Sequence, residues 1–422
     1  MSVLLKDVTL AGDVLGNVTN LYIEGDRIAE IGPKREAETV VDGKGKIALP
    51  GLVNLHTHAS MTLFRGFGDD MKLQDWLETR IWPKEAKLTP DDIYWGAKLA
   101  CLEMIKTGTT TFNDMYFQMD QVAKATKEMG LRAFLGEGLI DFNDAAAGQE
   151  MLKKVQGVNR KIEALKTARI VPVLAPHAIY TVSKDTLVAM KELADKKGYL
   201  LHTHLSETLR EVEDCLAKHA MRPAQYLDSL GALVRGVLLA HGCWLDPAEI
   251  ETIARAGSKI AHCPVSNMKL ASGQAMPYAA LKEAGVVMGL ATDGAASNNS
   301  LDMFETMKFA GLLQKFAHND PTVLPADEAF QMATLGGARA LGIDAGLLEV
   351  GRLADVILVD PRRAGMTPRH DDLSNVVYAA HGDCVDTVVC DGQVLMKGRR
   401  VKGEAEILEK AAAVARDVVT RA

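Results

Sequence analysis

The hydrophobic pattern divides the chain into two strand-rich ends and a different middle. Near the start, short segments of alternating apolar and polar residues, such as VLLKDVTLAG and NLYIEGDRIAEIG, are broken by Gly and Asp. The same texture returns in residues 351–360 and 386–400 and predicts antiparallel strands, followed by a charged helix after Gly403. We expect residues 1–50 and 345–422 to form one small β-sandwich domain built from both termini.

Residues 51–344 have a different hydrophobic pattern, in which apolar strand segments alternate with amphipathic helical ones. The strand segments include LVNLHTH, TTTFNDM, ARIVPVLAPHA, LLHTHLSE, VLLAHG, KIAHCPVS and VVMGLATDG. Such alternation predicts parallel β/α units, and about 290 residues suit an eight-stranded barrel. The predicted fold is therefore α/β: a distorted eight-stranded β/α (TIM-like) barrel beside the small β-sandwich.

Charge and composition exclude several classes of protein. The chain has 422 residues, with 48 basic and 55 acidic side chains and a net charge of −7. It has no long Lys/Arg run, so a nucleic-acid partner is not expected. No stretch reaches the roughly 18 uncharged apolar residues of a membrane helix, and Lys6, Asp7 and Asp13 interrupt the first segment. We expect no membrane association and a cytoplasmic location.

The six cysteines form no C-x-x-C pair, which fits neither a disulfide framework nor a thiolate zinc site. We expect reduced, mostly buried thiols. Cys263 follows a histidine and is a candidate nucleophile, but the apolar residues before it and Pro264 after it favour a strand end.

Residues able to bind a metal or to transfer a proton lie at the ends of the predicted barrel strands. His56 and His58 are two positions apart, so a strand places both on one face, and His202 and His204 repeat this spacing. Further candidates at strand ends are His177, Glu207, His241, His262 and Asp293. The carboxyl ends of barrel strands form one face, so we expect these side chains to converge.

A single histidine at a strand end is more often a structural hydrogen-bonding group than a ligand. The paired set is harder to explain in that way. Neutral imidazoles with a carboxylate suit zinc or ferrous iron, and a ligand set without cysteine favours a catalytic over a structural metal.

The motifs GLVNLHTH (51–58), HTHLSE, the histidine that ends VLLAHG, and TDG resemble those of the amidohydrolase superfamily. The resemblance covers essentially the whole chain, including the split terminal domain. More narrowly, HTHASMTLFRGFGDD, WPKEAKLT, APHAIYT, HTHLSET, HCPVSNMKLASG and ATDGAASNNSLDMF are similar to deaminases of 5′-modified adenosines. That family acts on 5′-methylthioadenosine and S-adenosylhomocysteine.

The resemblance implies one divalent metal, zinc first and ferrous iron as the alternative, held by His56, His58, His204 and Asp293. His202 is then a neighbouring packing or supporting residue. The binuclear branch of the superfamily carries a lysine on the fourth strand, and the corresponding segment here, RIVPVLAPH, has none.

The same resemblance implies hydrolytic deamination, in which metal-bound hydroxide attacks C6 of the purine and an inosine analogue and ammonia are formed. Glu207 protonates N1, Asp293 transfers a proton from the water to the leaving amino group, and His241 orients the hydroxide. Glu85 binds the ribose hydroxyls and His177 the purine edge; Glu207 and Asp293 also contact the substrate. A homo-oligomer, dimer or tetramer, is expected from the resemblance alone.

Some substrate-side interpretations stay open at the level of sequence. Glu85 is flanked by lysines and is also explained as a solvated carboxylate at a helix start. Trp76, Trp82, Phe64 and Met115 are candidates for apolar pocket walls or for the core.

The chain departs from the family pattern after the third predicted strand, because Glu137 stands where relatives that bind the homocysteine carboxylate often have arginine. A carboxylate there would repel that group. We therefore expect a preference for neutral 5′ groups, as in methylthioadenosine, 5′-deoxyadenosine or adenosine, and poorer use of S-adenosylhomocysteine.

Two competing hypotheses remain. The metal site could act on another aromatic ring, as in a triazine chlorohydrolase or a guanine or pterin deaminase, because a fold does not determine its substrate. Alternatively, the barrel could be a non-catalytic binding module, although such proteins usually lose the metal ligands that are retained here.

Overall fold

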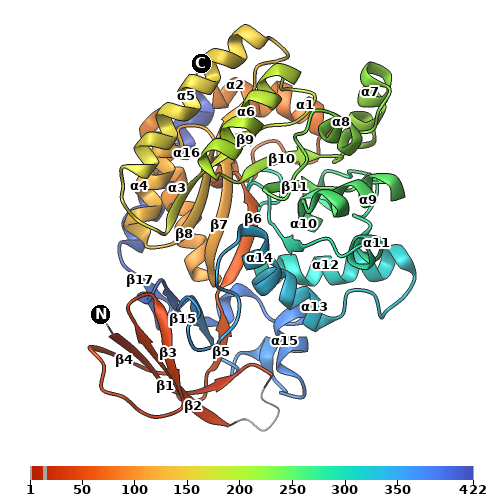
Figure 1. Cartoon of the computed structure of the whole chain (residues 1–422). Helices are drawn as coiled ribbons and strands as arrows, with labels where there is room; N and C mark the ends of the chain where they lie inside the picture. The colour runs from red at the N-terminus through yellow and green to blue at the C-terminus, as the bar shows by residue number, and fades with distance from the viewer. Residues whose placement is uncertain (1, 13–16, 422) are drawn as a thin grey trace.

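The computed structural model describes residues 2–12 and 17–421, and its centre is an eight-stranded parallel barrel (Figure 1). Hydrogen bonds join the strands in chain order, and the first and last strands are in contact, so the barrel is nearly closed. The strands are β6 (Leu52–Thr57), β7 (Thr109–Tyr116), β8 (Arg132–Leu139), β9 (Ile170–Pro176), β10 (Leu201–Leu205), β11 (Val237–His241), β12 (Lys259–His262) and β13 (Met288–Leu290). The predicted barrel is confirmed.

Helices follow the strands and cover the outside of the barrel (Figure 1). The longest connection, after β6, contains the turn Ala59–Phe64, α1 (Leu73–Trp76), the π-helical turn Leu77–Ile81, α2 (Trp82–Glu85) and α3 (Pro90–Lys106). The others are α4 (Met119–Met129), α5 (Ala145–Glu163), α6 (Lys184–Lys197), α7 (Leu209–His219), α8 (Pro223–Ser229), α9 (Pro247–Ala256), α10 (Pro264–Lys269), α11 (Tyr278–Glu283), α12 (Met303–His318), α13 (Ala326–Gln331) and α14 (Gly337–Leu341).

The start of α3 illustrates how the sequence sets these boundaries. The Thr89 hydroxyl accepts a hydrogen bond from the Asp92 backbone N–H, and the Asp92 carboxylate accepts one from the Thr89 N–H at 2.7 Å. This reciprocal cap, with Pro90 at the first helical position, satisfies N–H groups that a helix start leaves unpaired.

Both ends of the chain contribute to the second, mixed sheet, whose order is β17-β16-β15-β14-β5-β1-β2-β3, with β4 pairing to β1. In Figure 1 its N-terminal strands lie below the barrel beside the C-terminal ones. The strands are β1 (Ser2–Leu10), β2 (Val18–Glu24), β3 (Arg27–Ile31), β4 (Thr39–Asp42), β5 (Ile47–Pro50), β14 (Val356–Val359), β15 (Val385–Cys390), β16 (Gln393–Lys397) and β17 (Arg400–Val401). The small β domain from both termini is thus confirmed, with its strands hydrogen-bonded into one sheet.

Two further helices belong to the C-terminal part, α15 (Asp372–Tyr378) and α16 (Glu404–Thr420). The second is the predicted charged helix, and it packs against α3 of the barrel. At the base of the barrel, Arg132 of β8 pairs with Asp355 at 3.2 Å and with Asp391 at 2.9 Å. This largely buried network joins the barrel to the small sheet on the side away from the strand carboxyl ends.

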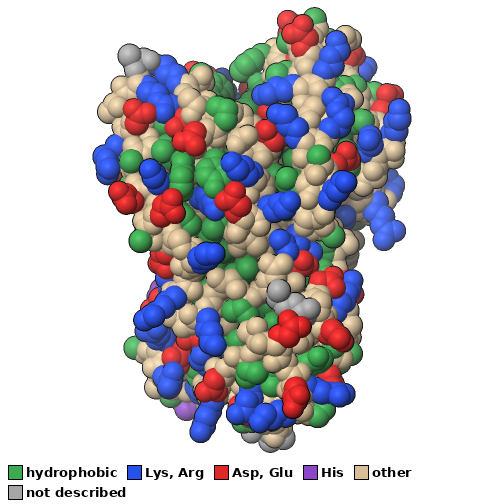
Figure 2. Space-filling model, turned by 90° about the vertical axis from the view of Figure 1, so that its left-hand side faces the viewer, with side chains coloured by type: hydrophobic (Ala, Val, Ile, Leu, Met, Phe, Trp, Pro, Cys, Tyr) green, Lys and Arg blue, Asp and Glu red, His purple; other side chains and the backbone are tan. Residues whose placement is uncertain are grey.

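The surface carries both signs of charge. Figure 2 shows basic and acidic side chains interspersed over one face, with small hydrophobic areas between them. Within the described residues, no helix combines the length and the apolar character needed to span a bilayer. All six cysteines are buried and free, as the spacing predicted.

Candidate active site

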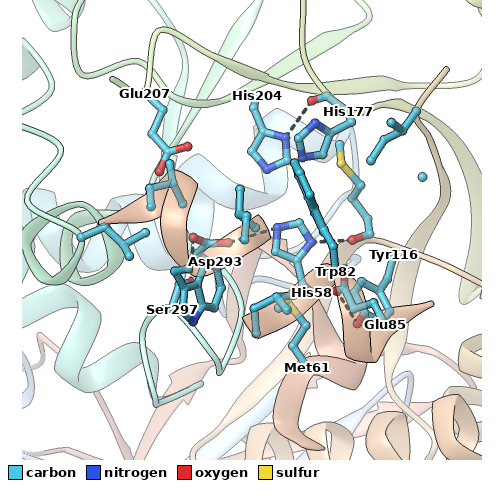
Figure 3. Close-up of a pocket in the computed structure, with 18 of the residues that line it drawn as sticks. His58, Met61, Trp82, Glu85, Tyr116, His177, His204, Glu207, Asp293 and Ser297 are labelled. Atoms are coloured by element: carbon cyan, nitrogen blue, oxygen red, sulfur yellow. Dashed lines mark hydrogen bonds and ion pairs between the residues drawn. The ribbon is translucent and has the colours of Figure 1, made fainter. Parts of the chain in front are cut away.

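The carboxyl ends of β6, β10 and β13 bring a cluster of imidazoles and one carboxylate together (Figure 3). Asp293 Oδ1 lies 3.3 Å from His56 Nε2 and 3.2 Å from His58 Nε2. Ligand atoms of His56, His58 and His204 lie within 4.8 Å of one another, as do those of His56, His241 and Asp293. Ligand atoms this close to one another could coordinate one shared cation.

Hydrogen bonds to the far ring nitrogens determine which nitrogen of each candidate ligand carries the proton when the ring is neutral. His58 Nδ1 donates to the Met115 carbonyl at 2.5 Å, and His204 Nδ1 donates to the His177 carbonyl at 2.7 Å. A carbonyl can only accept, so in each neutral ring the proton is on Nδ1 and the lone pair on Nε2.

His202 fixes the third ligand in the same way. Its Nδ1 donates to the Leu238 carbonyl at 3.0 Å, which leaves its Nε2 to accept from His56 Nδ1 at 2.7 Å. His56 Nε2 is then buried, unprotonated and without a hydrogen-bond partner. An orphaned buried acceptor beside two similar nitrogens and a carboxylate fits a divalent cation, with His202 supporting from behind.

Asp293 is held rigidly and ionised. Its Oδ2 accepts hydrogen bonds from the hydroxyls of Ser266 at 2.6 Å and Ser297 at 3.0 Å, and its Oδ1 accepts the Gly294 N–H at 2.8 Å. Burial opposes ionisation, but the neighbouring His56 and His58 more than offset burial and hold the pKa of Asp293 well below its ordinary value.

Glu207 lies on the turn that follows β10, on the opposite side of the cluster from Glu85 (Figure 3). Burial raises the pKa of its carboxyl, which favours the protonated form of an acid in a pocket. The buried Glu211 carboxylate accepts the backbone N–H groups of Ser206 and Glu207, both at 2.9 Å. These bonds hold a turn in which Ser206 has a φ of 49°, an unusual value away from glycine.

His241 ends β11 close to this acid, with its Nε2 3.8 Å from Glu207 Oε2. Its Nδ1 lies 3.0 Å from the side-chain nitrogen of Asn267, on α10. His241 and Asp293 also adopt left-handed backbone conformations, with φ of 72° and 64°. Strained backbone at several strand ends is a common mark of a functional site.

A pocket opens onto this cluster. Its polar lining includes the metal-ligand candidates His58, His204 and Asp293, with other predicted site residues His177, Glu207, His241 and Glu85. Its apolar wall comes largely from the long connection after β6: Leu73, Trp76, Leu77, Ile81 and Trp82. Of the four residues for which the sequence left pocket wall and core open, Trp76, Trp82 and Met115 line the pocket, whereas Phe64 is buried in the core.

The substrate-side candidates Glu85 and His177 face the pocket from different elements (Figure 3). Glu85 accepts a hydrogen bond from the Tyr116 hydroxyl at 2.6 Å, so it is not simply a solvated surface carboxylate. His177 follows β9 and is hydrogen-bonded through Nδ1 to the Thr181 hydroxyl at 2.8 Å. Burial lowers the pKa of His177 to about 3, so this ring is neutral at physiological pH.

Comparisons with known proteins agree with this site. The model of the Amidohydrolase family matches residues 47–395. The chain belongs to the amidohydrolase family. It is 50% identical over 422 residues to a 5′-deoxyadenosine deaminase of Methanoregula boonei, covering 98% of this chain and 95% of the relative. It is 48% identical over 415 residues to the 5-methylthioadenosine/S-adenosylhomocysteine deaminase 1 of Archaeoglobus fulgidus, covering 97% of each chain.

Among solved structures, an adenosine deaminase from Xanthomonas campestris with bound zinc matches with a TM-score of 0.93 and 35% identity, over 99% of both chains. Together with the histidine and aspartate cluster, this family membership identifies a divalent-metal site in the barrel. The fourth strand, β9, carries no lysine, in keeping with one metal in this amidohydrolase.

The structure corrects the interpretation of Glu137. This residue lies inside β8, its side chain is 0% exposed, and it pairs with Lys154 at 2.8 Å and accepts the Met119 N–H at 2.9 Å. The neighbouring Gly138, which faces the other side of the strand, lines the pocket instead. Glu137 therefore points away from the substrate, and its charge cannot repel a substrate tail directly.

Several site residues were not predicted from the sequence. Tyr116, Ser297 and Asn267 are examples, and Asp114 accepts hydrogen bonds at 2.8 Å from both the Thr57 hydroxyl and the Ala59 N–H next to the metal-ligand candidates. Tyr116 and Asp114 end the strand TTTFNDMY, so the strand-end rule could have found both. His262, which that rule did select, is buried but is not part of the pocket lining.

Proposed function

We propose that this amidohydrolase deaminates adenosine-type nucleosides hydrolytically, forming the inosine analogue and ammonia. The proposal rests on the joint placement, on one pocket, of a three-histidine, one-aspartate cluster and a buried carboxyl group, that of Glu207, whose pKa is raised by burial. Relatives named as deaminases of 5′-deoxyadenosine and methylthioadenosine support the same reaction.

We also propose zinc as the resident metal, held by His56, His58, His204 and Asp293, because this donor set without thiolates suits catalytic zinc. Ferrous iron fits the same ligands and is the alternative. A divalent cation at such a site lowers the pKa of water towards neutrality and makes it a nucleophile near pH 7.

The protein residues then supply the proton transfers. As the water oxygen bonds to C6, negative charge moves to the ring nitrogen N1, where Glu207 donates its proton. Asp293, ionised and fixed by its two serine hydroxyls, accepts the proton of the water and delivers it to the amino group. The C6–N bond breaks, ammonia leaves and the C6=O bond forms, while the second proton of the water returns to Glu207 and restores the acid. His241 orients the water from its place beside Glu207.

Glu85 is assigned to the ribose hydroxyls and His177 to the purine edge. Neutral His177 can exchange hydrogen bonds with the ring without adding a charge. A ribose contact favours a nucleoside over a free purine, pterin or triazine, because those rings offer no vicinal hydroxyls to Glu85.

For the 5′ group, the pocket lining favours a neutral, apolar substituent. Leu73, Trp76 and Leu77 contribute apolar surface, and the described lining residues include no lysine or arginine. A homocysteine carboxylate would be desolvated there without a cationic partner, which is costly. The preference for 5′-deoxyadenosine or methylthioadenosine over S-adenosylhomocysteine thus stands on the pocket lining and not on Glu137.

A substrate panel tests this function. Zinc-loaded protein would be incubated with 5′-deoxyadenosine, methylthioadenosine, adenosine, S-adenosylhomocysteine, guanine, a pterin and a triazine, and ammonia release would be measured. We expect the highest kcat/KM for the first two compounds and the lowest among the nucleosides for S-adenosylhomocysteine. Activity on guanine, the pterin or the triazine alone would refute the proposal.

We also propose a cytoplasmic location for the protein, which the free thiols of its six cysteines fit.

A further inference from the structure

A hydrogen bond between two pocket residues is not explained by metal binding or by proton transfer. Tyr116 is the last residue of β7, is 4% exposed, and donates its hydroxyl to Glu85 Oε1 at 2.6 Å (Figure 3). Its ring also lies beside the metal-ligand candidate His58, with ring centroids 6.3 Å apart. Tyr116 therefore connects the end of a barrel strand to a carboxylate on the connection that covers the pocket.

The chemical states of the two groups define the direction of this bond. Burial and the neighbouring Glu85 raise the pKa of Tyr116 well above its ordinary value, so the phenol stays neutral and donates. Burial raises the pKa of Glu85 above its ordinary value, and the bond from Tyr116 opposes this rise by favouring the ionised carboxylate. Within the described residues, Glu85 Oε2 accepts no hydrogen bond from the protein, so that oxygen stays available to a ligand.

We propose that Tyr116 is a positioning residue that sets the orientation of Glu85 and thereby makes the enzyme select ribonucleosides over deoxyribonucleosides. The inference rests on the proposed function, in which Glu85 accepts hydrogen bonds from the ribose. A glutamate side chain rotates about several bonds. The bond from Tyr116 holds Oε1 of Glu85 at the rigid end of a strand. Oε2, together with the remaining lone pair of Oε1, is then directed towards the vicinal hydroxyls of the ribose.

The alternative is that the hydrogen bond between Tyr116 and Glu85 has only a structural role. A buried tyrosine needs some partner for its hydroxyl, and Glu85 would serve even if its orientation did not matter for binding. Loss of a structural bond would change all substrates alike. Loss of a positioning bond would act mainly on KM. Its effect would be largest for a substrate that keeps both vicinal hydroxyls and smaller for one that keeps a single hydroxyl.

The experiment combines Tyr116→Phe and Glu85→Gln, singly and together, with three substrates: 5′-deoxyadenosine, 2′,5′-dideoxyadenosine and 3′,5′-dideoxyadenosine. Phenylalanine keeps the volume of the ring and removes only the hydroxyl. Tyr94→Phe is the matched control, because Tyr94 donates to Glu128 at the same distance of 2.6 Å but is outside the pocket lining. Melting temperature and metal content are measured for every variant.

We expect Tyr116→Phe to raise KM for 5′-deoxyadenosine by about tenfold, the usual size for one hydrogen bond to a charged group, with kcat changed by less than about threefold. The kcat/KM values for the dideoxy substrates should stay within about threefold. In the Glu85→Gln background, Tyr116→Phe should cause no further loss of discrimination, and Tyr94→Phe should resemble the wild type throughout.

An equal loss on all three substrates, or no loss on 5′-deoxyadenosine, would overturn the inference while leaving deamination intact. If Glu85→Gln itself left ribose discrimination unchanged, the assignment of Glu85 in the proposed function would be wrong. Absence of deamination by the zinc-loaded wild type would refute the proposed function itself. The three outcomes are distinguishable because each is measured on a different protein: Tyr116→Phe, Glu85→Gln or the wild type.

Discussion

Replacing Glu207 by glutamine tests the proposed proton path. The substitution keeps the shape of the side chain and the backbone bond from residue 207 to Glu211, but it removes the proton donor. The other carboxylates in the pocket lining are poor substitutes: Asp293 is held ionised, and Figure 3 shows Glu85 on the opposite side of the metal-ligand candidates. We therefore expect a loss of kcat near the middle of the usual range for general acids, about 10³-fold or roughly 4 kcal/mol of activation free energy.

The assay is the initial rate of ammonia release from 5′-deoxyadenosine by zinc-loaded protein. KM should change by only a few fold and zinc content should stay at the wild-type level, because Glu207 is not among the metal-ligand candidates. Glu213→Gln is the matched control and should retain full activity, because Glu213 is an exposed glutamate on α7, the helix that follows the turn with Glu207. Glu207→Gln with near-normal kcat would refute the reasoning, since the ring nitrogen would then obtain its proton elsewhere.

Three further predictions concern the metal, the fold and the substrate tail. His204→Ala should bind zinc much more weakly, so that added zinc no longer raises the melting temperature as in the wild type; an unchanged zinc-dependent shift would contradict the ligand assignment. Burial raises the pKa of Asp302 to about 6 from 3.8, so the folded state binds more protons than the unfolded state between these values. The unfolding free energy of the wild type relative to Asp302→Asn should therefore fall, by up to about 3 kcal/mol, as pH rises from below 4 to above 6; urea unfolding at several pH values measures it, and a constant or rising difference would disagree. Glu137→Gln should lower the melting temperature by a few degrees but leave the ratio of kcat/KM for 5′-deoxyadenosine and S-adenosylhomocysteine unchanged within about twofold; a selective gain for S-adenosylhomocysteine would show that Glu137 does act on the substrate.

The barrel and its ligand candidates could be predicted because they depend on local patterns. Alternation of strand and helix determines a parallel barrel, and the barrel gathers whatever its strands carry at their carboxyl ends. Spacing made the pairs His56 and His58, and His202 and His204, candidates, and the family resemblance selected His204 over His202 as the ligand. The predicted homo-oligomer and the exact domain boundaries stay predictions.

The remaining errors and omissions depend on geometry that the sequence does not contain. Glu137 was placed after the third strand, but that strand runs to Leu139 and includes Glu137. Successive side chains of a strand point to opposite sides, so the place of Glu137 within the strand decides which way its side chain points. Tyr116 and Asn267 act through partners 31 and 26 residues away in the chain, and those contacts exist only once the barrel has formed.

Hydrolytic deamination at the metal site is tested by following the nucleoside and ammonia together in a reaction of 5′-deoxyadenosine with protein loaded with one equivalent of zinc. We expect 5′-deoxyinosine and ammonia to appear in equal amounts, both to be lost for protein stripped of metal, and both to form about 10³-fold more slowly with Glu207→Gln. No ammonia from the fully loaded wild type, or undiminished release from the stripped protein, would contradict it.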